Sequence, residues 1–262
     1  MPPARAALLL SSLAGIGWLV RALWVGPPPL VSALVALFGY LVLVLVGVVA
    51  SGLRMFADVL TRGPSNARGV VLTFDDGPDP LTTLQLLDAL ERAQAHATFF
   101  VAPRKVLAHP ELARAIVQRG HAIGLYGPAD ERFFALRGRV RVRRLFTEAL
   151  ATVERECGVR PSLFRPAGGH VSPAMAAVAE ELDVLVIGWS VGGPGDRWSR
   201  NEAALERRFG NGLRDGAIVL LPGASQGSPP SAASLGALAV VLHALVRLQL
   251  GTVRIDEWLD AD

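Results

Sequence analysis

The sequence predicts an α/β fold in which one domain follows a pair of membrane-spanning helices. Three observations lead to this prediction. The N-terminal segment is almost free of charge, short apolar runs then alternate with amphipathic segments, and glycine or proline follows several of the apolar runs. Such alternation implies a parallel sheet, either open or closed into a barrel. Of the 262 residues, 51% are hydrophobic, and the part after the apolar segment is long enough to bury one core.

Residues 1–55 are predicted to form a membrane segment with spans at about 6–25 and 30–53. The second span contains no charged residue and is long enough to cross a bilayer. Near the end of the first span, Arg21 can reach the interface, where Trp18 and Trp24 would act as anchors. A hairpin is favoured over a cleaved signal peptide because the first apolar region is long and a second span follows it.

The two spans place the protein in the cell membrane, with the lipid bilayer as a partner, whereas the flanking charges leave the side of the domain open. Arginines lie on both sides of the hairpin, which favours the cytoplasm for both ends by a small margin. Residues 56–68 are expected to be a linker, and 69–262 the folded domain. The arginine-rich run at 137–144 has no interleaved aromatic residue, so it indicates a solvated helix face and no nucleic acid as partner.

Seven strands and the helices between them follow from the periodicity of the domain. Strands are expected at 70–74, 97–102, 121–125, 162–165, 184–190, 217–221 and 252–255. Helices are expected at 81–94, 110–119, 140–157, 173–182, about 201–209 and 231–248. In such folds the functional loops begin at the carboxyl ends of the strands.

Two adjacent carboxylates, Asp75 and Asp76, follow the first of these strands, and Gly77 and Pro78 end it. Neighbouring carboxylates at a strand end suit a division of labour, in which one binds a metal ion and the other is a base for water. The alternative is a turn in which the pair caps the next helix. The length of the whole string at 73–80 favours the functional interpretation.

Several strings make residues 69–259 resemble the polysaccharide deacetylase family, also called the NodB-homology domain or carbohydrate esterase family 4. They are Thr-Phe-Asp-Asp-Gly-Pro at 73–78, Ala-Thr-Phe-Phe-Val at 97–101, Gly-His-Ala-Ile-Gly at 120–124, Arg-Pro-Ala-Gly-Gly at 165–169 and Trp-Ser-Val at 189–191. The resemblance implies an irregular seven-stranded (β/α) barrel. It also implies removal of N- or O-acetyl groups from chitin-like sugars, peptidoglycan and related glycans with a divalent metal, often zinc.

The same motifs imply roles for individual residues. Asp75 resembles the family's catalytic base and Asp76 its metal-binding carboxylate. Arg165 resembles the arginine that orients the catalytic aspartate. Gly168 stands where the family uses a backbone N–H to bind the oxyanion. His170 follows directly and is expected either to line the pocket or to cap the next helix.

Four functional positions of the family differ in this sequence, and one of them is Gly192, which stands where the fourth motif usually has an aspartate. The two metal-binding histidines of the second motif are replaced by Tyr126 and Asp130, and the general-acid histidine of the fifth motif by Pro222. His121 matches a non-ligand histidine and is expected to be structural. If Asp76, Asp130 and Tyr126 held a metal, this all-oxygen set would suit Mn²⁺ or Mg²⁺ better than zinc. The alternative is that no metal binds.

Three functions are therefore expected from the sequence. The first is a membrane-anchored polysaccharide deacetylase-family protein that acts on or binds N-acetylated glycans of the cell envelope, with its activity reduced or lost. The second is an active hydrolase of carbon–nitrogen (amide) bonds with an altered, oxygen-rich metal site. The third is a non-catalytic platform for a protein partner whose identity the sequence does not reveal.

Overall fold

In the computed structural model, parallel strands form one sheet in the order β5-β4-β3-β2-β1-β6. The structure describes residues 2–49, 55–127, 137–193, 209, 212–222 and 230–259. Within these residues the strands are β1 (Val71–Gly77), β2 (Ala97–Val101), β3 (Ala122–Tyr126), β4 (Leu163–Arg165), β5 (Leu185–Val186) and β6 (Ile218–Leu221). The predicted α/β class with a parallel sheet is confirmed.

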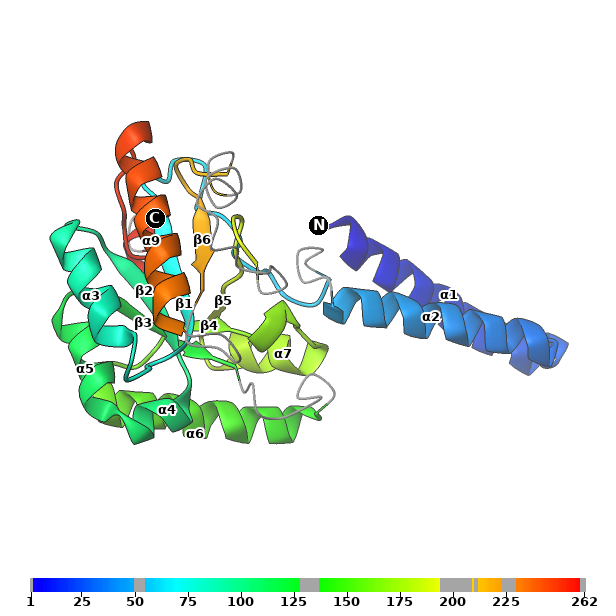
Figure 1. The fold of residues 1–262 in the computed structure, drawn as a ribbon. Helices are drawn as coiled ribbons and strands as arrows, with labels where there is room; N and C mark the ends of the chain where they lie inside the picture. The colour runs from blue at the N-terminus through cyan, green and yellow to red at the C-terminus, as the bar shows by residue number, and fades with distance from the viewer. Residues whose placement is uncertain are drawn as a thin grey trace.

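Helices surround the sheet, and a pair of helices projects from the domain (Figure 1). The surrounding helices are α3 (Thr83–Arg92), α4 (Pro103–Ala108), α5 (Pro110–Gln118), α6 (Arg139–Cys157), α7 (Pro173–Glu181) and α9 (Pro230–Leu248). Alternate residues along the strands belong to two different buried clusters. Leu72 and Phe99 pack toward the helices, whereas Val71 and Phe100 fill the concave side.

The sheet curls into a half-barrel whose two edges are joined by the irregular segment after β5. Backbone N–H groups of Ser190 and Val191 donate to the carbonyl of Ile218 in β6. On the β5 side, the N–H of Leu60 donates to Val186, and the N–H of Gly188 donates to Leu60. These bonds pair the backbone at both edges of the sheet, which would otherwise expose unpaired polar groups.

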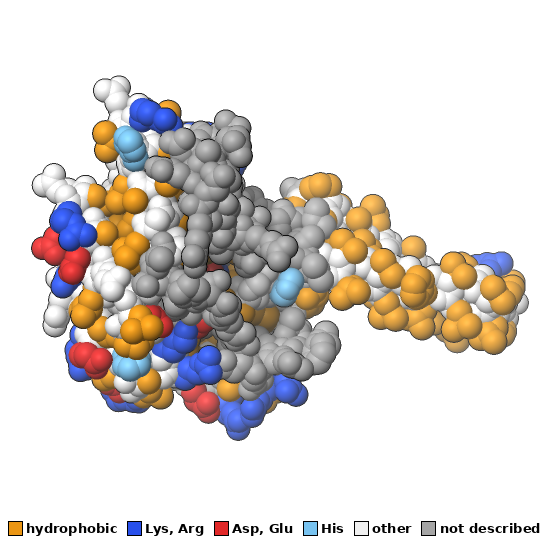
Figure 2. Space-filling view, in the orientation of Figure 1, with side chains coloured by type: hydrophobic (Ala, Val, Ile, Leu, Met, Phe, Trp, Pro, Cys, Tyr) orange, Lys and Arg blue, Asp and Glu red, His pale blue; other side chains and the backbone are white. Residues whose placement is uncertain are grey.

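The projecting pair consists of α1 (Pro3–Val25) and α2 (Leu30–Val49). By length and composition, both helices are able to cross a membrane, and a signal sequence near an N-terminus would pass the same test. The hydroxyls of Ser12 and Tyr40 lie 3.2 Å apart and connect the two helices. Figure 2 shows that apolar side chains cover the projecting pair, whereas charged side chains gather on the domain.

Several elements differ from the sequence predictions. The expected strand at 252–255 is reduced to a single bridge between Thr252 and Val70, and the chain then enters a short helix, α10 (Asp256–Leu259). Helix α4 occupies the place of an expected loop, because Pro103 suits the first turn of a helix. Of the helix expected at about 201–209, only Phe209 lies within the described residues.

The segment expected to be a linker packs on the domain where it is described. Ala57 and Val59 are 9% and 3% exposed, and Arg62 forms a backbone bridge with Ala217. The Arg5 guanidinium of α1 contacts the Asp58 carboxylate at 3.2 Å. The N–H of Val171 donates to the carbonyl of Val48 at the end of α2. The hairpin is therefore in contact with the domain at its open end.

Candidate active site

The adjacent carboxylates lie at the carboxyl end of β1, as predicted. The pairing of β1 with β2 shifts register between Asp75 and Gly77, and the bond between Gly77 and Pro78 is cis. Asp76 has a φ of 59°, in the left-handed region that non-glycine residues rarely adopt. The strand therefore ends in an irregular turn, and the two carboxylates contact different partners.

Asp75 is paired with the buried Arg165 at the end of β4. The Arg165 Nη1 donates to Asp75 Oδ1 at 2.9 Å and to the Thr73 hydroxyl at 2.6 Å. Its Nε and Nη2 donate to the carbonyls of Ile187 and Gly188 at 3.3 and 2.8 Å. These contacts use the guanidinium on several sides at once, and they hold Asp75 in one orientation.

Two aromatic rings also lie near the guanidinium of Arg165. It lies 4.1 Å from the centre of the Phe100 ring and 5.8 Å from that of Trp189. Burial raises the pKa of Asp75, although the charge and hydrogen bond of Arg165 act in the opposite direction and the Asp76 charge adds to the rise. A carboxyl group in this setting has the environment of a general base or acid.

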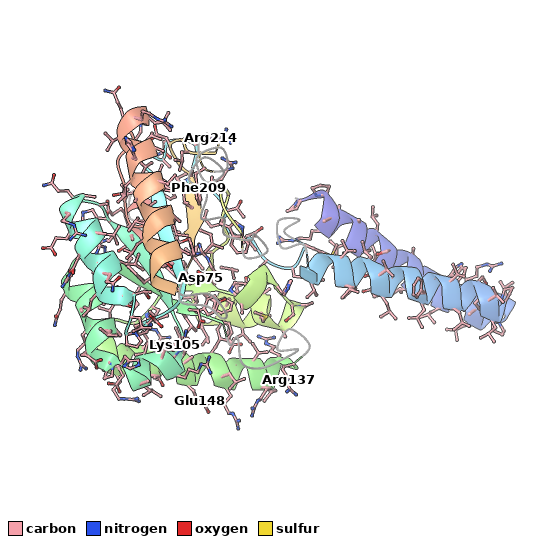
Figure 3. All side chains as sticks on the ribbon, in the orientation of Figure 1. Asp75, Lys105, Arg137, Glu148, Phe209 and Arg214 are labelled. Atoms are coloured by element: carbon pink, nitrogen blue, oxygen red, sulfur yellow. The ribbon has the colours of Figure 1, made fainter. Side chains whose placement is uncertain are left out.

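Asp76 contacts a different cation, the ammonium group of Lys105 in α4. The Lys105 Nζ lies 2.9 Å from Asp76 Oδ2 and donates to the backbone carbonyl of the same residue at 2.7 Å. The Asp76 side chain is 5% exposed and that of Lys105 is 23% exposed. Asp76 Oδ1 is buried without a hydrogen-bond partner in the described structure. Figure 3 shows Asp75 and Lys105 at the same end of the sheet.

Tyr126, at the end of β3, is the first of the two residues that the sequence comparison with the family motif expects in place of histidine. Its pKa is raised well above the usual value of 10.0, first by burial and then by the charges of Asp75 and Asp76. A backbone hydrogen bond from Gly168 acts in the opposite direction. The Tyr126 hydroxyl is therefore neutral at physiological pH, and it is bonded to the residue whose N–H was expected to face an oxyanion.

Gly168 lies in the short 3-10 turn η3 (Ala167–Gly169) with a φ of 66°. A Cβ at this position would lie 3.2 Å from the His170 ring, so that ring occupies the space beside Gly168. Ser172 accepts the capping hydrogen bond from the Met175 N–H at the start of α7. Ser172 therefore caps α7, which is one of the two roles that were expected for His170.

The remaining predicted positions are placed as follows. Asp130 lies outside the described residues. Pro222 is buried directly after β6. The alternative in which Asp75 and Asp76 cap the next helix is not observed, because Asp79 accepts the hydrogen bonds from the N–H groups of Leu81 and Thr82 ahead of α3.

The described side chains do not fit a divalent metal ion. They contain no group of three His, Cys, Asp or Glu side chains that could hold one. Of the expected ligands, Asp76 already bonds an ammonium group through Oδ2, and Tyr126 is a neutral hydroxyl. The buried, unpaired Asp76 Oδ1 is the one feature that a metal would satisfy.

The sequence analysis did not identify Lys105 as a site residue, although one feature of the sequence could have drawn attention to it. It is the only lysine among the 26 Lys and Arg residues of the chain. The sequence predicted a loop beginning at Pro103, and nothing in that prediction placed Lys105 against Asp76. Only the turn of α4 brings its ammonium to Asp76.

The fold and the site define a (β/α) half-barrel of the hydrolase type, with a carboxylate and arginine pair at the carboxyl ends of its strands. The family model for polysaccharide deacetylase matches residues 62–187. The peptidoglycan-N-acetylglucosamine deacetylase of Bacillus cereus is 30% identical over 205 residues, which are 75% of this chain and 90% of that protein. The chain belongs to the polysaccharide deacetylase family.

Two solved structures show the same fold. A family 4 acetyl xylan esterase from Clostridium thermocellum in complex with a cobalt ion is 28% identical, with a TM-score of 0.62 over 73% of this chain and 90% of that one. A family 4 pseudoenzyme from Bacillus anthracis is 21% identical, with a TM-score of 0.66 over 79% and 71%. The chain spans only 32–33% of the length of some other peptidoglycan deacetylases that it matches.

Proposed function

We propose that this chain is a membrane-anchored member of the polysaccharide deacetylase family that binds N-acetylated glycans of the cell envelope, with its deacetylase activity reduced or lost. The observation that carries the proposal is the contrast between the two carboxylates. Asp75 keeps its arginine partner at 2.9 Å, whereas Asp76 is bound by Lys105 at 2.9 Å.

Two surrounding residues and one structural neighbour further support loss of the chemistry. The Tyr126 hydroxyl replaces a metal-binding imidazole and bonds the backbone of Gly168. Pro222 has no proton to give, and loss of general-acid catalysis typically costs about 10²–10⁴-fold in rate. The B. anthracis neighbour is described as a pseudoenzyme, so this fold is compatible with the absence of activity.

Glycan binding is proposed from the family and from the part of the site that is retained. The B. cereus relative is a deacetylase of peptidoglycan N-acetylglucosamine. In this chain, Asp75 is 14% exposed and its orientation is fixed by Arg165. The carboxylate can accept a hydrogen bond from a sugar hydroxyl or amide, and Trp189 beside Arg165 offers an aromatic face for a sugar ring.

Membrane anchoring is proposed from the exposure of the hairpin. No residue of α1 is buried, and large apolar side chains such as Leu23, Trp24 and Phe38 are 70–86% exposed. An exposed apolar surface of this kind is costly in water and favourable in lipid. The alternative, a signal sequence, would remove α1 and leave a new N-terminus in the mature protein.

Turnover and binding of defined glycans test the function. The full chain in detergent is expected to release no acetate from N-acetyl chito-oligomers or peptidoglycan fragments above the level of Asp75→Asn. Calorimetry is expected to show binding of at least one of these ligands, weakened in Asp75→Asn and unchanged in Arg143→Met, which alters only an exposed ion pair. Turnover abolished by Asp75→Asn would contradict the proposed loss of activity.

A second candidate is an active deacetylase with an oxygen-rich metal site. The buried Asp76 Oδ1, which has no partner among the described residues, is the observation that favours it. This function requires that Mn²⁺, Zn²⁺ or Co²⁺ raise the melting temperature of the metal-free chain. Wild-type protein that gains no stability with any of these ions, at concentrations that saturate weak sites, would exclude it.

A further inference from the structure

Lys105 differs from the other basic residues of the chain in the type of its charged group. All the remaining residues among the 26 Lys and Arg are arginines, so the only side-chain ammonium group is the one that meets Asp76. Arginine presents a broad planar fork, whereas lysine presents a compact charge with three donors. A compact charge is what a site shaped around a single metal ion can accommodate.

Lys105 makes two contacts with Asp76 that a bound metal cation could make at this position. The ammonium binds the Asp76 carboxylate at 2.9 Å and the Asp76 carbonyl at 2.7 Å. Because it binds both the side chain and the backbone carbonyl of Asp76, the ammonium stabilises the left-handed backbone of that residue, whose φ is 59°. The carboxylate oxygen that it occupies is one that a metal would need.

The charges at this edge also balance without a metal. Asp75 is paired with Arg165 and Asp76 with Lys105, each at 2.9 Å. Within the described residues, two carboxylates thus meet two fixed cations. A divalent ion entering beside Lys105 would face its ammonium at close range, and this repulsion is strong in a poorly solvated site.

We propose that Lys105 is a built-in substitute for the divalent cation, holding Asp76 in place of a metal and excluding metal from the site. The inference rests on the proposed loss of metal chemistry. Its tests, however, measure melting temperature and zinc affinity instead of turnover, so the inference and the proposed function can fail separately.

The first test is a double-mutant cycle on the full chain in detergent, using Lys105→Met, Asp76→Asn and the two together. Removing one partner of a buried ion pair leaves a charge without compensation, so Lys105→Met is expected to lower the melting temperature by roughly 10 °C. The double variant carries neither charge and is expected to recover much of this loss. The matched control is Arg160→Met, which breaks an exposed pair with Glu154 and is expected to change little.

Two outcomes of the cycle would overturn the proposal. One is a Lys105→Met protein that melts as high as the Arg160→Met control. The other is a double variant whose loss equals the sum of the two single losses, because independent roles add. If Lys105→Met does not fold, the folding of the double variant supplies the same evidence for coupling, and its failure to fold overturns the proposal.

The second test asks whether Lys105 excludes metal. Tyr126→His and Asp130→His together restore the imidazoles of the family motif, and zinc binding is measured by calorimetry with and without Lys105→Met. Zinc affinity is expected to be at least about tenfold higher without the lysine, because Asp76 Oδ2 is then free. Equal affinity in the two backgrounds would overturn the proposal.

Discussion

Replacing Arg165 with methionine tests whether the retained carboxylate and arginine pair organises the edge of the sheet. Methionine fills much of the same volume but donates no hydrogen bond. The guanidinium of Arg165 is fully buried and bonds Asp75, the Thr73 hydroxyl and two backbone carbonyls. The substitution therefore leaves a carboxylate and several buried acceptors without their partner.

The expected cost is large. Breaking a buried pair by removing one member costs about 3–5 kcal/mol, and each buried acceptor left unsatisfied adds about 1 kcal/mol or more. With three such acceptors, a total of about 6–8 kcal/mol is a large part of the stability of a typical domain, which is about 5–15 kcal/mol. The Arg165→Met domain is thus expected to be largely unfolded in urea concentrations that the wild type tolerates.

The loss is also expected to depend on pH. Without Arg165, nothing opposes the rise that burial causes in the pKa of Asp75. When the pKa of an acid is raised in the folded state, the folded protein binds more protons than the unfolded protein. The stability of the protein therefore falls as the pH rises. The variant should therefore lie closer to the wild type at acidic pH than at neutral pH.

Urea unfolding followed by tryptophan fluorescence measures these differences. Arg143→Met is the control, because it breaks an exposed pair with Glu181 at 2.7 Å and is expected to cost about 1 kcal/mol or less. An Arg165→Met protein within about 1 kcal/mol of the control at neutral pH would refute the assigned role of the arginine.

Three further predictions concern other parts of the chain. His121 is 5% exposed, and burial, with smaller contributions from nearby positive groups, lowers its pKa from 6.5 to about 4. The unfolded chain therefore binds a proton that the folded chain does not, and stability falls as the pH drops below 6.5; His121→Phe should remove about 2 kcal/mol of the stability lost between pH 7 and pH 5. Equal losses of stability in the wild type and the variant would contradict this. Gly168→Ala should lower the free energy of unfolding by about 1–2 kcal/mol because the φ of Gly168 is 66°, whereas Gly236→Ala in α9, where a Cβ meets open space, should leave it unchanged or raise it by about 0.5–1 kcal/mol. Urea unfolding measures both variants, and an equal loss of stability in the two would contradict the conformational argument. Leu41→Arg in the middle of α2 should weaken insertion by about 2.5–3.5 kcal/mol and reduce the share of chain that resists carbonate extraction, and an unchanged share would argue against a spanning α2.

Local patterns predicted the position of the carboxylates because a buried strand and its terminating Gly77-Pro78 are encoded within eight residues. The contact between Asp75 and Arg165 joins residues 90 positions apart, and only the family motifs placed the two residues in one site. The parallel sheet was predictable because alternating strands and helices leave few arrangements, whereas only the family resemblance indicated that the sheet curls toward a barrel.

Other features depend on tertiary contacts that no local pattern reports. The segment at 252–255 is rich in the β-branched residues that favour strands, yet Ile255 and Trp258 are buried on the concave side of the sheet and only Thr252 pairs. The segment after Met55 has few regular elements, but its backbone pairs with the edges of the half-barrel. Lys105 became significant only when α4 placed it against Asp76.

Metal analysis of the purified full-length chain tests the central claim most directly. Elemental analysis after purification in metal-replete buffer compares the wild type with Asp76→Ala. If Lys105 has replaced the metal and the chemistry is lost, both proteins should carry far less than one divalent ion per chain. One zinc, manganese or cobalt ion per wild-type chain, lost in Asp76→Ala, would contradict the account.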